Sequence, residues 1–322
     1  MTTRTNAIEV AGLRKSYGTH EVVAGVDLTV PAGTVYALLG PNGAGKTTTV
    51  RILSTLLPAD SGAARVAGYD VRRDARRVRA SIGVTGQFSA VDELLTGREN
   101  LRMMADLGHL DRHRARTVVG RLLERFELAD AADRRAVTYS GGMKRRLDLA
   151  MTLVSGPRLI FLDEPTTGLD PRSRRELWRI VRELVADGAT VFLTTQYLEE
   201  ADQLADRIGV LDGGRLVAEG TAAELKRLVP GGHIELRAAD SERTAELARR
   251  LPEAVANVEA LTVTLPHDGS LGALRRVLDR IDDDDDVAGL AVRTPDLDDA
   301  FLALTGRPTT DESAENSKKV PV

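Results

Sequence analysis

The stretch Gly40–Thr47, with the sequence GPNGAGKT, decides the fold of this chain. It fits the pattern G-x-x-x-x-G-K-[ST], in which glycines let backbone N–H groups turn inward and approach an anion closely. Val35–Leu39 before it is predicted to be a buried strand, and Lys46–Leu56 after it a helix. A strand, this loop and a helix in that order bind nucleotide phosphates. The predicted nucleotide contacts are Gly40, Asn42, Gly43, Ala44, Gly45, Lys46, Thr47 and Thr48.

Two acidic residues add the chemistry of hydrolysis to this loop. Asp163 and Glu164 directly follow Leu159–Leu162, a predicted buried strand. An aspartate at such a strand end holds Mg²⁺ in P-loop enzymes, and the hydroxyl of Thr47 is a second Mg²⁺ ligand. Glu164 can polarise an attacking water as a general base. The alternative, an acidic pair that only solvates a turn, is disfavoured because the phosphate loop is present.

Composition limits the classes of function. The chain has 322 residues, 42% of them hydrophobic, a formal net charge of −4 and no cysteine. Disulfides, thiolate zinc sites and cysteine nucleophiles are therefore excluded, and nothing predicts bulk electrostatic binding to nucleic acid. No secretory pattern or apolar run of about 20 residues is visible. We expect a cytoplasmic chain that reaches a membrane only through a partner.

Alternating strand and helix patterns predict two domains. Residues 7–225 are expected to form a mostly parallel α/β domain with an antiparallel portion, which includes short strands at Ala7–Val10 and Val26–Val30. A helical insert is expected at about 97–156. Residues 232–306 are predicted to form a small α+β domain, and the polar residues 307–322 a disordered tail.

A second anion cradle is predicted at Ser140-Gly141-Gly142, before the basic helix that starts near Lys144. Free N–H groups and the positive end of the helix dipole favour an anion there. One nucleotide does not need two such cradles from one chain, which indicates that this one serves the nucleotide of another subunit. The alternative is an ordinary serine N-cap with a glycine turn.

The segments 40–48 (GPNGAGKTT), 139–143 (YSGGM) and 159–170 (LIFLDEPTTGLD) together resemble the ATP-binding subunit of an ABC transporter, a P-loop ATPase. The resemblance covers about residues 7–225. It implies a head-to-tail homodimer around two ATP–Mg²⁺, each held between Lys46 of one copy and the signature Ser140, Gly141 and Gly142 of the other. It further implies that Tyr17 stacks on adenine, that Gln87 contacts Mg²⁺ and faces a membrane subunit, and that Asp170 lies at the dimer seam.

Two positions depart from the family pattern. The fifth signature residue is commonly Gln and is Met143 here, although the backbone cradle remains. The switch position normally carries His and is Gln196 here. A glutamine amide can donate a hydrogen bond to a phosphate but cannot carry a proton or a positive charge near pH 7. We therefore expect hydrolysis to depend on Glu164, with Gln196 as a positioning group in the catalytic site.

The glutamine at the switch position also indicates one subgroup of the ABC transporter family. Residues 194–208 (TTQYLEEADQLADRI) and 294–306 (TPDLDDAFLALTG) resemble the daunorubicin-resistance type of drug exporter. That resemblance implies ATP-driven efflux of a hydrophobic drug or antibiotic through a separate permease, with this chain peripheral at the cytoplasmic face of the membrane. The alternatives are a lipid or glycolipid exporter ATPase, a soluble ABC ATPase without a transport role, and a regulatory module without turnover, which the intact Glu164 disfavours.

Overall fold

The computed structural model describes residues 5–86, 90–228, 232–251, 253–267, 270–281, 287–293 and 296–306. Two predictions lie outside these residues: the role of Gln87 and the disorder of 307–322. Contacts divide the chain into two compact units, and the division falls between Ala222 and Ala223.

The larger unit contains a six-stranded sheet in the order β10-β9-β3-β8-β7-β6. Five strands run parallel, and β10 is antiparallel to β9. Every residue of β3, β7 and β8 is buried, as expected of parallel strands covered on both faces. The predicted parallel sheet is confirmed. Its strands are β3 Val35–Leu39, β6 Ile82–Thr85, β7 Leu159–Asp163, β8 Thr190–Thr195, β9 Arg207–Asp212 and β10 Arg215–Gly220.

A four-stranded antiparallel sheet, ordered β2-β1-β4-β5, forms the predicted antiparallel portion. Its strands are β1 Asn6–Tyr17, β2 His20–Pro31, β4 Ser61–Val66 and β5 Tyr69–Asp70. The first two are much longer than the strands expected at 7–10 and 26–30. Register shifts interrupt β1, and Gly12 and Gly25 adopt φ of +56° and +87°. Such bulges break the alternation of apolar residues, so the sequence pattern shows only parts of each strand.

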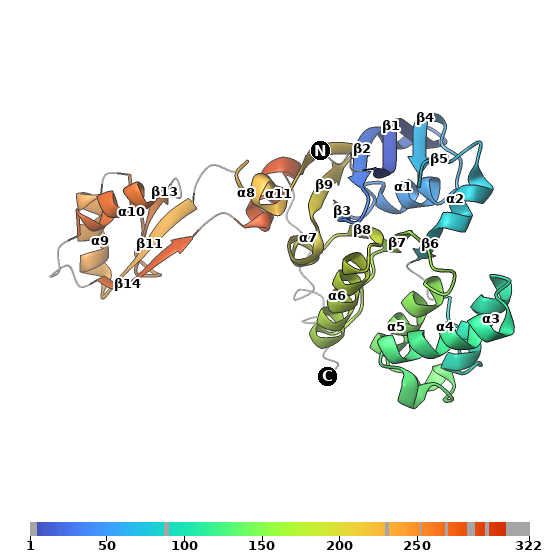
Figure 1. Ribbon diagram of the computed structural model, residues 1–322. Helices are drawn as coiled ribbons and strands as arrows, with labels where there is room; N and C mark the ends of the chain where they lie inside the picture. The colour runs from blue at the N-terminus through green and yellow to red at the C-terminus, as the bar shows by residue number, and fades with distance from the viewer. Residues whose placement is uncertain are drawn as a thin grey trace, which may run out of the picture. The chain divides into compact units, whose positions relative to one another are not determined.

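The described part of the larger unit contains seven α-helices, of which α1 lies beside the antiparallel sheet and α3 and α4 lie apart from the sheets (Figure 1). They are α1 Lys46–Leu53, α2 Ala75–Ser81, α3 Gly97–Leu107, α4 Arg112–Arg125, α5 Gly141–Thr152, α6 Pro171–Ala186 and α7 Leu198–Leu204. Helices α3, α4 and α5 gather into one helical subdomain, which corresponds to the expected insert. The prediction that α1 reaches Leu56 was wrong, because Thr55 adopts the left-handed φ of +65° and the helix ends before it.

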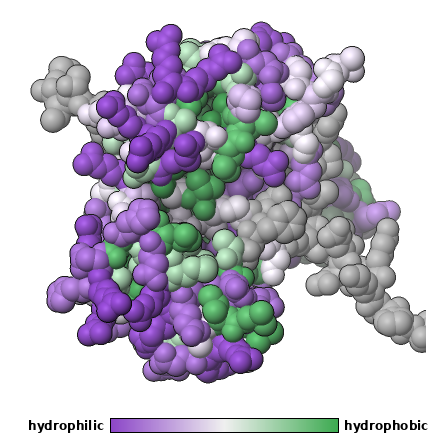
Figure 2. Space-filling model, turned by 90° about the vertical axis from the view of Figure 1, so that its right-hand side faces the viewer, coloured by the Kyte–Doolittle hydropathy of each residue, from purple (hydrophilic) through white to green (hydrophobic). Residues whose placement is uncertain are grey.

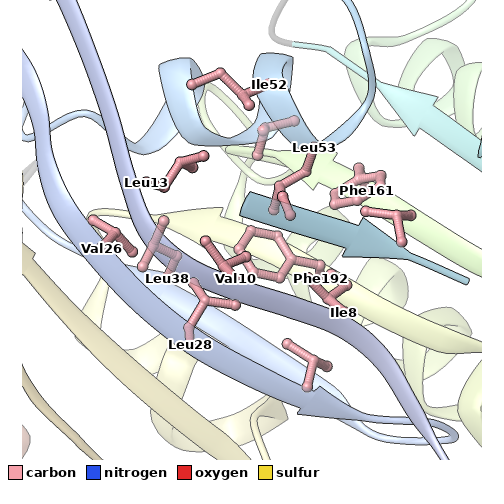
Figure 3. Packing of buried hydrophobic residues seen from close by; sticks show 14 of the residues in the cluster. Ile8, Val10, Leu13, Val26, Leu28, Leu38, Ile52, Leu53, Phe161 and Phe192 are labelled. Carbon is pink, nitrogen blue, oxygen red and sulfur yellow. The ribbon is translucent and has the colours of Figure 1, made fainter. Parts of the chain in front are cut away.

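The core of the larger unit lies between the antiparallel sheet, helix α1 and the parallel sheet (Figure 3). Leu13 and Val26 point into it from β1 and β2, and Leu53 from α1. Phe192 of β8 stacks on Tyr36 of β3, with ring centroids 5.4 Å apart. Helix α1 is therefore held by apolar contacts, which fixes the loop that precedes it.

The smaller unit is built on an antiparallel sheet in the order β12-β13-β11-β14. Its elements are β11 Gly232–Ala238, α9 Ser241–Arg250, β12 Val255–Asn257, β13 Thr262–His267, α10 Leu271–Leu278, β14 Val287–Arg293 and α11 Leu297–Thr305. Its core includes Ile234, Leu236, Leu247 and Val263. The α+β prediction is confirmed. Strand β12 was not predicted, because all of its residues are exposed and leave no apolar pattern.

Hydrophilic side chains cover most of the face shown in Figure 2, with apolar residues in smaller areas. This agrees with the charged content of the sequence, 29%. No helix in the described part of the chain is long and apolar enough to cross a membrane.

Candidate nucleotide-binding site

The loop between β3 and α1 favours glycine at three positions, through a positive φ angle, a close backbone contact, or both. Gly43 and Gly45 have φ of +82° and +104°. A Cβ atom on Gly45 would lie 2.5 Å from the carbonyl oxygen of Val22, and one on Gly40 would lie 2.2 Å from that of Leu211. The glycines of the motif are thus required by close backbone approach as well as by turn geometry.

Lys46 is fixed at the start of α1 by its neighbours in the loop. Its Nζ donates hydrogen bonds to the carbonyl oxygens of Gly40, at 2.7 Å, and Pro41, at 3.1 Å. The same Nζ lies 3.3 Å from Oε1 of Glu164, and the Lys46 side chain is only 4% exposed. Burial lowers the pKa of Lys46, while the carboxylates of Glu164 and Asp163 oppose this shift. The ammonium group of Lys46 is therefore positioned to bind an anion at this loop.

Lys46 and Glu164 line a pocket of about 150 Å³ together with Val22 and loop residues Asn42, Gly43, Gly45, Thr47 and Thr48. Sites for whole drug-sized ligands usually enclose about 300–1,000 Å³. Most of its lining belongs to the loop from Gly40 to Thr48, so the pocket suits the phosphate groups of a nucleotide.

Asp163 is the last residue of β7, beside the phosphate loop, and it accepts hydrogen bonds from two hydroxyl groups. Thr47 Oγ1 donates to Asp163 Oδ1 at 3.1 Å, and Thr194 Oγ1 donates to the same oxygen at 2.5 Å. Oxygen ligands of this kind suit Mg²⁺, which usually takes one or two carboxylates and completes its shell with phosphates and water. Among the described residues no group of three or more His, Cys, Asp or Glu side chains stands ready for a metal. The donor set therefore fits a cation shared with bound phosphates.

Glu164 follows Asp163 with the left-handed φ of +48°. Its backbone N–H donates to the carbonyl oxygen of Thr194 at 3.1 Å, and this bond holds the turn against β8. Thr194 was not predicted as a site residue. It faces Asp163 in the parallel register of β7 and β8, a pairing that no local sequence pattern specifies.

The signature residues form a second group at the N-terminus of α5. Ser140 caps this helix, and its Oγ accepts a hydrogen bond from the backbone N–H of Met143 at 3.3 Å. A Cβ atom on Gly142 would lie 2.5 Å from Ser173 Oγ, whereas Gly141 faces open space. The small size of Gly142 therefore lets α5 pack on α6, and Gly141 remains open to a ligand.

Asp170 belongs to the same group as the signature residues. It caps α6, and Ser173 Oγ donates to its Oδ2 at 2.7 Å. Hydrogen bonds from Ser173 lower the pKa of Asp170. Within the described residues, no hydrogen bond or ion pair joins this group to the phosphate loop.

Tyr17 and Gln196 are the other predicted site residues in the described part of the chain. Tyr17 ends β1, is 49% exposed, and has Lys15 Nζ 5.9 Å from its ring centroid. Gln196 directly follows β8 and is half-buried. The exposed ring of Tyr17 is free of covering core residues, which suits a stacking role. Gln87 lies outside the described residues.

A phosphate loop with its lysine, followed by an acidic pair at a neighbouring strand end, defines a P-loop nucleoside triphosphatase. Residues 23–167 match the model of the ABC transporter family. A solved ATP-binding subunit of an ABC transporter, 30% identical, superposes with a TM-score of 0.62 over 69% of this chain and 92% of its own.

Curated relatives match nearly the whole chain. Daunorubicin resistance ATP-binding protein DrrA2 of Streptomyces coeruleorubidus is 50% identical over 97% of this chain and 98% of its own length. Doxorubicin resistance ATP-binding protein DrrA of Mycobacterium tuberculosis is 46% identical over 94% and 95%. Nod factor export ATP-binding protein I of Rhizobium sp. is 40% identical over 94% and 97%. The chain belongs to the ABC transporter ATP-binding proteins, in the daunorubicin-resistance group, which confirms the predicted fold class and family.

Proposed function

We propose that this chain binds and hydrolyses ATP and thereby drives efflux of a hydrophobic drug or antibiotic through a separate membrane permease. The observation that carries the ATPase role is the convergence of Lys46, Thr47, Asp163 and Glu164 around one phosphate-sized pocket. The drug-export role is supported by the relatives, which are named for resistance to daunorubicin and doxorubicin. The chain would act at the cytoplasmic face of the membrane, held there by the permease.

In this proposal, separate residues bind the phosphates, hold Mg²⁺ and activate water. The loop from Gly40 to Thr48 holds the phosphates, and Lys46 binds them with its charge. Thr47, Asp163 and Gln87 would hold Mg²⁺, which neutralises phosphate charge when bound. Lys46 Nζ lies 3.3 Å from Glu164 Oε1, so bound phosphates would compete with Glu164 for the charge of Lys46. Glu164 is then released to polarise the attacking water, and Gln196 positions the reacting group by donating a hydrogen bond.

A second copy of the chain would complete each site. The pocket of one copy is lined mainly by its own phosphate loop, while Ser140, Gly141 and Gly142 form a separate cradle with an open side. In a head-to-tail homodimer this cradle closes over the partner's ATP, Asp170 lies at the seam, and Tyr17 stacks on adenine. The arrangement makes ATP binding and dimer closure the same event.

Glu164→Gln tests the ATPase role. The amide preserves size but cannot act as a base, so ATP turnover should fall by about 10²–10⁴-fold while binding of a fluorescent ATP analogue is retained. Gln196→Ala should reduce turnover without abolishing it. Full turnover by Glu164→Gln would contradict the proposed base. Unchanged turnover by Gln196→Ala would remove its positioning role.

Co-purification with a permease and a screen of stimulating compounds tests the transport role. We expect ATPase activity of the complex to rise with hydrophobic drug-like compounds. Stimulation by a lipid or glycolipid instead would favour the alternative exporter, which the relative named for Nod factor export supports. Absence of any co-purifying membrane protein, with ATPase activity intact, would favour a soluble ATPase.

A further inference from the structure

Arg145 of helix α5 binds two separate chain segments near the predicted catalytic residues. Its Nε donates to the carbonyl oxygen of Pro165 at 2.8 Å, and its Nη1 donates to that of Gly86 at 2.9 Å. Its Nη2 lies 3.5 Å from the carbonyl oxygen of Asp163. The side chain is only 11% exposed. One guanidinium therefore joins the signature helix to both sides of the Glu164 turn and to the end of β6.

Asp148, one turn further along α5, completes this arrangement. Its Oδ2 lies 3.3 Å from Arg145 Nη1, and its Oδ1 accepts a hydrogen bond from the backbone N–H of Ala90 at 3.1 Å. Gly86 and Ala90 are the described residues on either side of 87–89. The buried pair thus fixes the chain on both sides of that segment to the same helix.

Stability alone does not explain why such a pair is present. Burial lowers the pKa of Arg145 and raises that of Asp148, so each charge is maintained at a desolvation cost. A buried ion pair is often no more stabilising than apolar residues of similar volume. Its distinctive property is geometric, because the planar guanidinium holds its donors in a fixed fork whose spacing and directions the compact ammonium of a lysine does not reproduce.

We propose that Arg145 is a positioning residue that couples the Glu164 turn of one ATP site to the signature helix serving the other. When the turn from Asp163 to Pro165 responds to nucleotide, Arg145 transmits the displacement to α5, whose N-terminus carries the signature Ser140–Gly142. The two ATP sites of the dimer thereby hydrolyse cooperatively. This inference rests on the proposed two-copy ATPase.

Arg145→Lys in the full chain tests the coupling, because it retains the charge but not the set of hydrogen bonds. With ATP and Mg²⁺, we expect kcat to fall by about 10–100-fold, as when catalytic groups are displaced by about 1 Å. KM should change less than about 2-fold, and the Hill coefficient should fall from above 1 to about 1. Arg145→Met combined with Asp148→Leu avoids an unpaired buried charge and should show the same kinetic pattern.

The matched control is Arg125→Met. It breaks the ion pair of Arg125 with Asp187, at 2.8 Å, which also links the helical subdomain to the end of α6 but lies away from the site. It should leave kcat and the Hill coefficient unchanged.

The outcomes separate the inference from the proposed function. Wild-type kcat and cooperativity in folded Arg145→Lys, or in the double variant, would overturn the coupling role and leave the ATPase role intact. A wild-type chain that does not hydrolyse ATP would overturn the proposed function and this inference with it, whereas hydrolysis without cooperativity would overturn this inference alone. Thermal melting of each variant verifies that it is folded.

Discussion

A buried carboxyl group behind the switch residue offers a sharp test of the structure. Glu200 of α7 is completely buried, and its Oε1 accepts a hydrogen bond from Trp178 Nε1 of α6 at 3.1 Å. Trp178 is the single tryptophan of the chain and is 4% exposed. Helix α7 begins directly after Gln196 and Tyr197, so this bond ties the switch segment to α6. Glu200→Ala removes the acceptor and leaves a buried N–H without a partner.

The magnitude follows from burial and from the lost hydrogen bond. An unsatisfied buried donor costs about 1–3 kcal/mol, and each buried methylene removed costs about 0.8 kcal/mol. Glu200→Ala removes one methylene besides the carboxyl group, so we expect it to lower the free energy of unfolding by about 2–4 kcal/mol. Glu200→Gln keeps the size and an acceptor oxygen for Trp178, so its effect near neutral pH should stay within about 1 kcal/mol.

The assay is urea unfolding of both variants, followed by Trp178 fluorescence and, in parallel, by far-ultraviolet circular dichroism. The fluorescence reports on the contact itself, and the dichroism controls for a change in emission without unfolding. A loss below about 0.5 kcal/mol in Glu200→Ala, within the range of ordinary surface substitutions, would refute the reasoning. Equal losses in the Ala and Gln variants would refute the role of the acceptor.

The same residue predicts a pH dependence. Burial raises the pKa of Glu200 above its ordinary value of 4.5. Because the folded chain favours the protonated form, this contribution to stability is fully present below pH 4.5 and is lost as the pH rises through the raised pKa. Glu200→Gln carries no titrating group, so its stability relative to wild type should increase as the pH rises above 4.5. A relative decrease over that range would contradict the prediction.

Four further predictions rest on local geometry. Gly45→Ala should weaken binding of a fluorescent ATP analogue by at least about 10-fold, because Gly45 has φ of +104° and a close backbone neighbour. Tyr36→Phe should stabilise the chain to urea by about 1 kcal/mol, because the buried Tyr36 hydroxyl has no hydrogen-bond partner within the described residues. A Cβ atom on Gly209 would lie 2.3 Å from that hydroxyl, so Gly209→Ala should cost less stability in Tyr36→Phe than in wild type. Asp240→Ala should remove the N-cap of α9 and lower the stability of the smaller unit by about 1 kcal/mol.

Each of these predictions has a contrary result. Gly43→Ala is the comparison for Gly45→Ala, since a Cβ atom on Gly43 meets nothing within 4 Å; equal losses would show that only the positive φ matters. Additive effects of Tyr36→Phe and Gly209→Ala would exclude the predicted contact. An Asp240→Ala melting curve that coincides with wild type would exclude a stabilising cap.

The phosphate loop could be predicted from sequence because its determinants are local. Glycine supplies the positive φ angles, and Lys46 is fixed by carbonyl groups a few residues away. The buried strands were predictable for the same reason, since continuous apolar runs such as Leu159–Leu162 need no knowledge of their neighbours.

The remaining features depend on how distant segments pair. Thr194 meets Asp163 only because β7 and β8 align in one particular parallel register. The contacts of Arg145 join α5 to the ends of β6 and β7, and no periodicity of the helix identifies that one arginine. The requirement for a small residue at Gly142 comes from Ser173 on another helix. In each case the role of the residue comes from its contacts in the folded chain, and its local sequence does not reveal that role.

At Glu164, the backbone conformation that costs stability occurs at the residue proposed to activate water. A left-handed φ of +48° costs a residue with a Cβ atom about 1–2 kcal/mol, which glycine would not pay. Glu164→Gly should therefore be more stable than Glu164→Ala, although both lack the carboxylate. A selection for thermal resistance alone would favour replacing the very side chain proposed to activate water. If Glu164 activates water as proposed, the left-handed backbone at this residue exchanges stability for turnover.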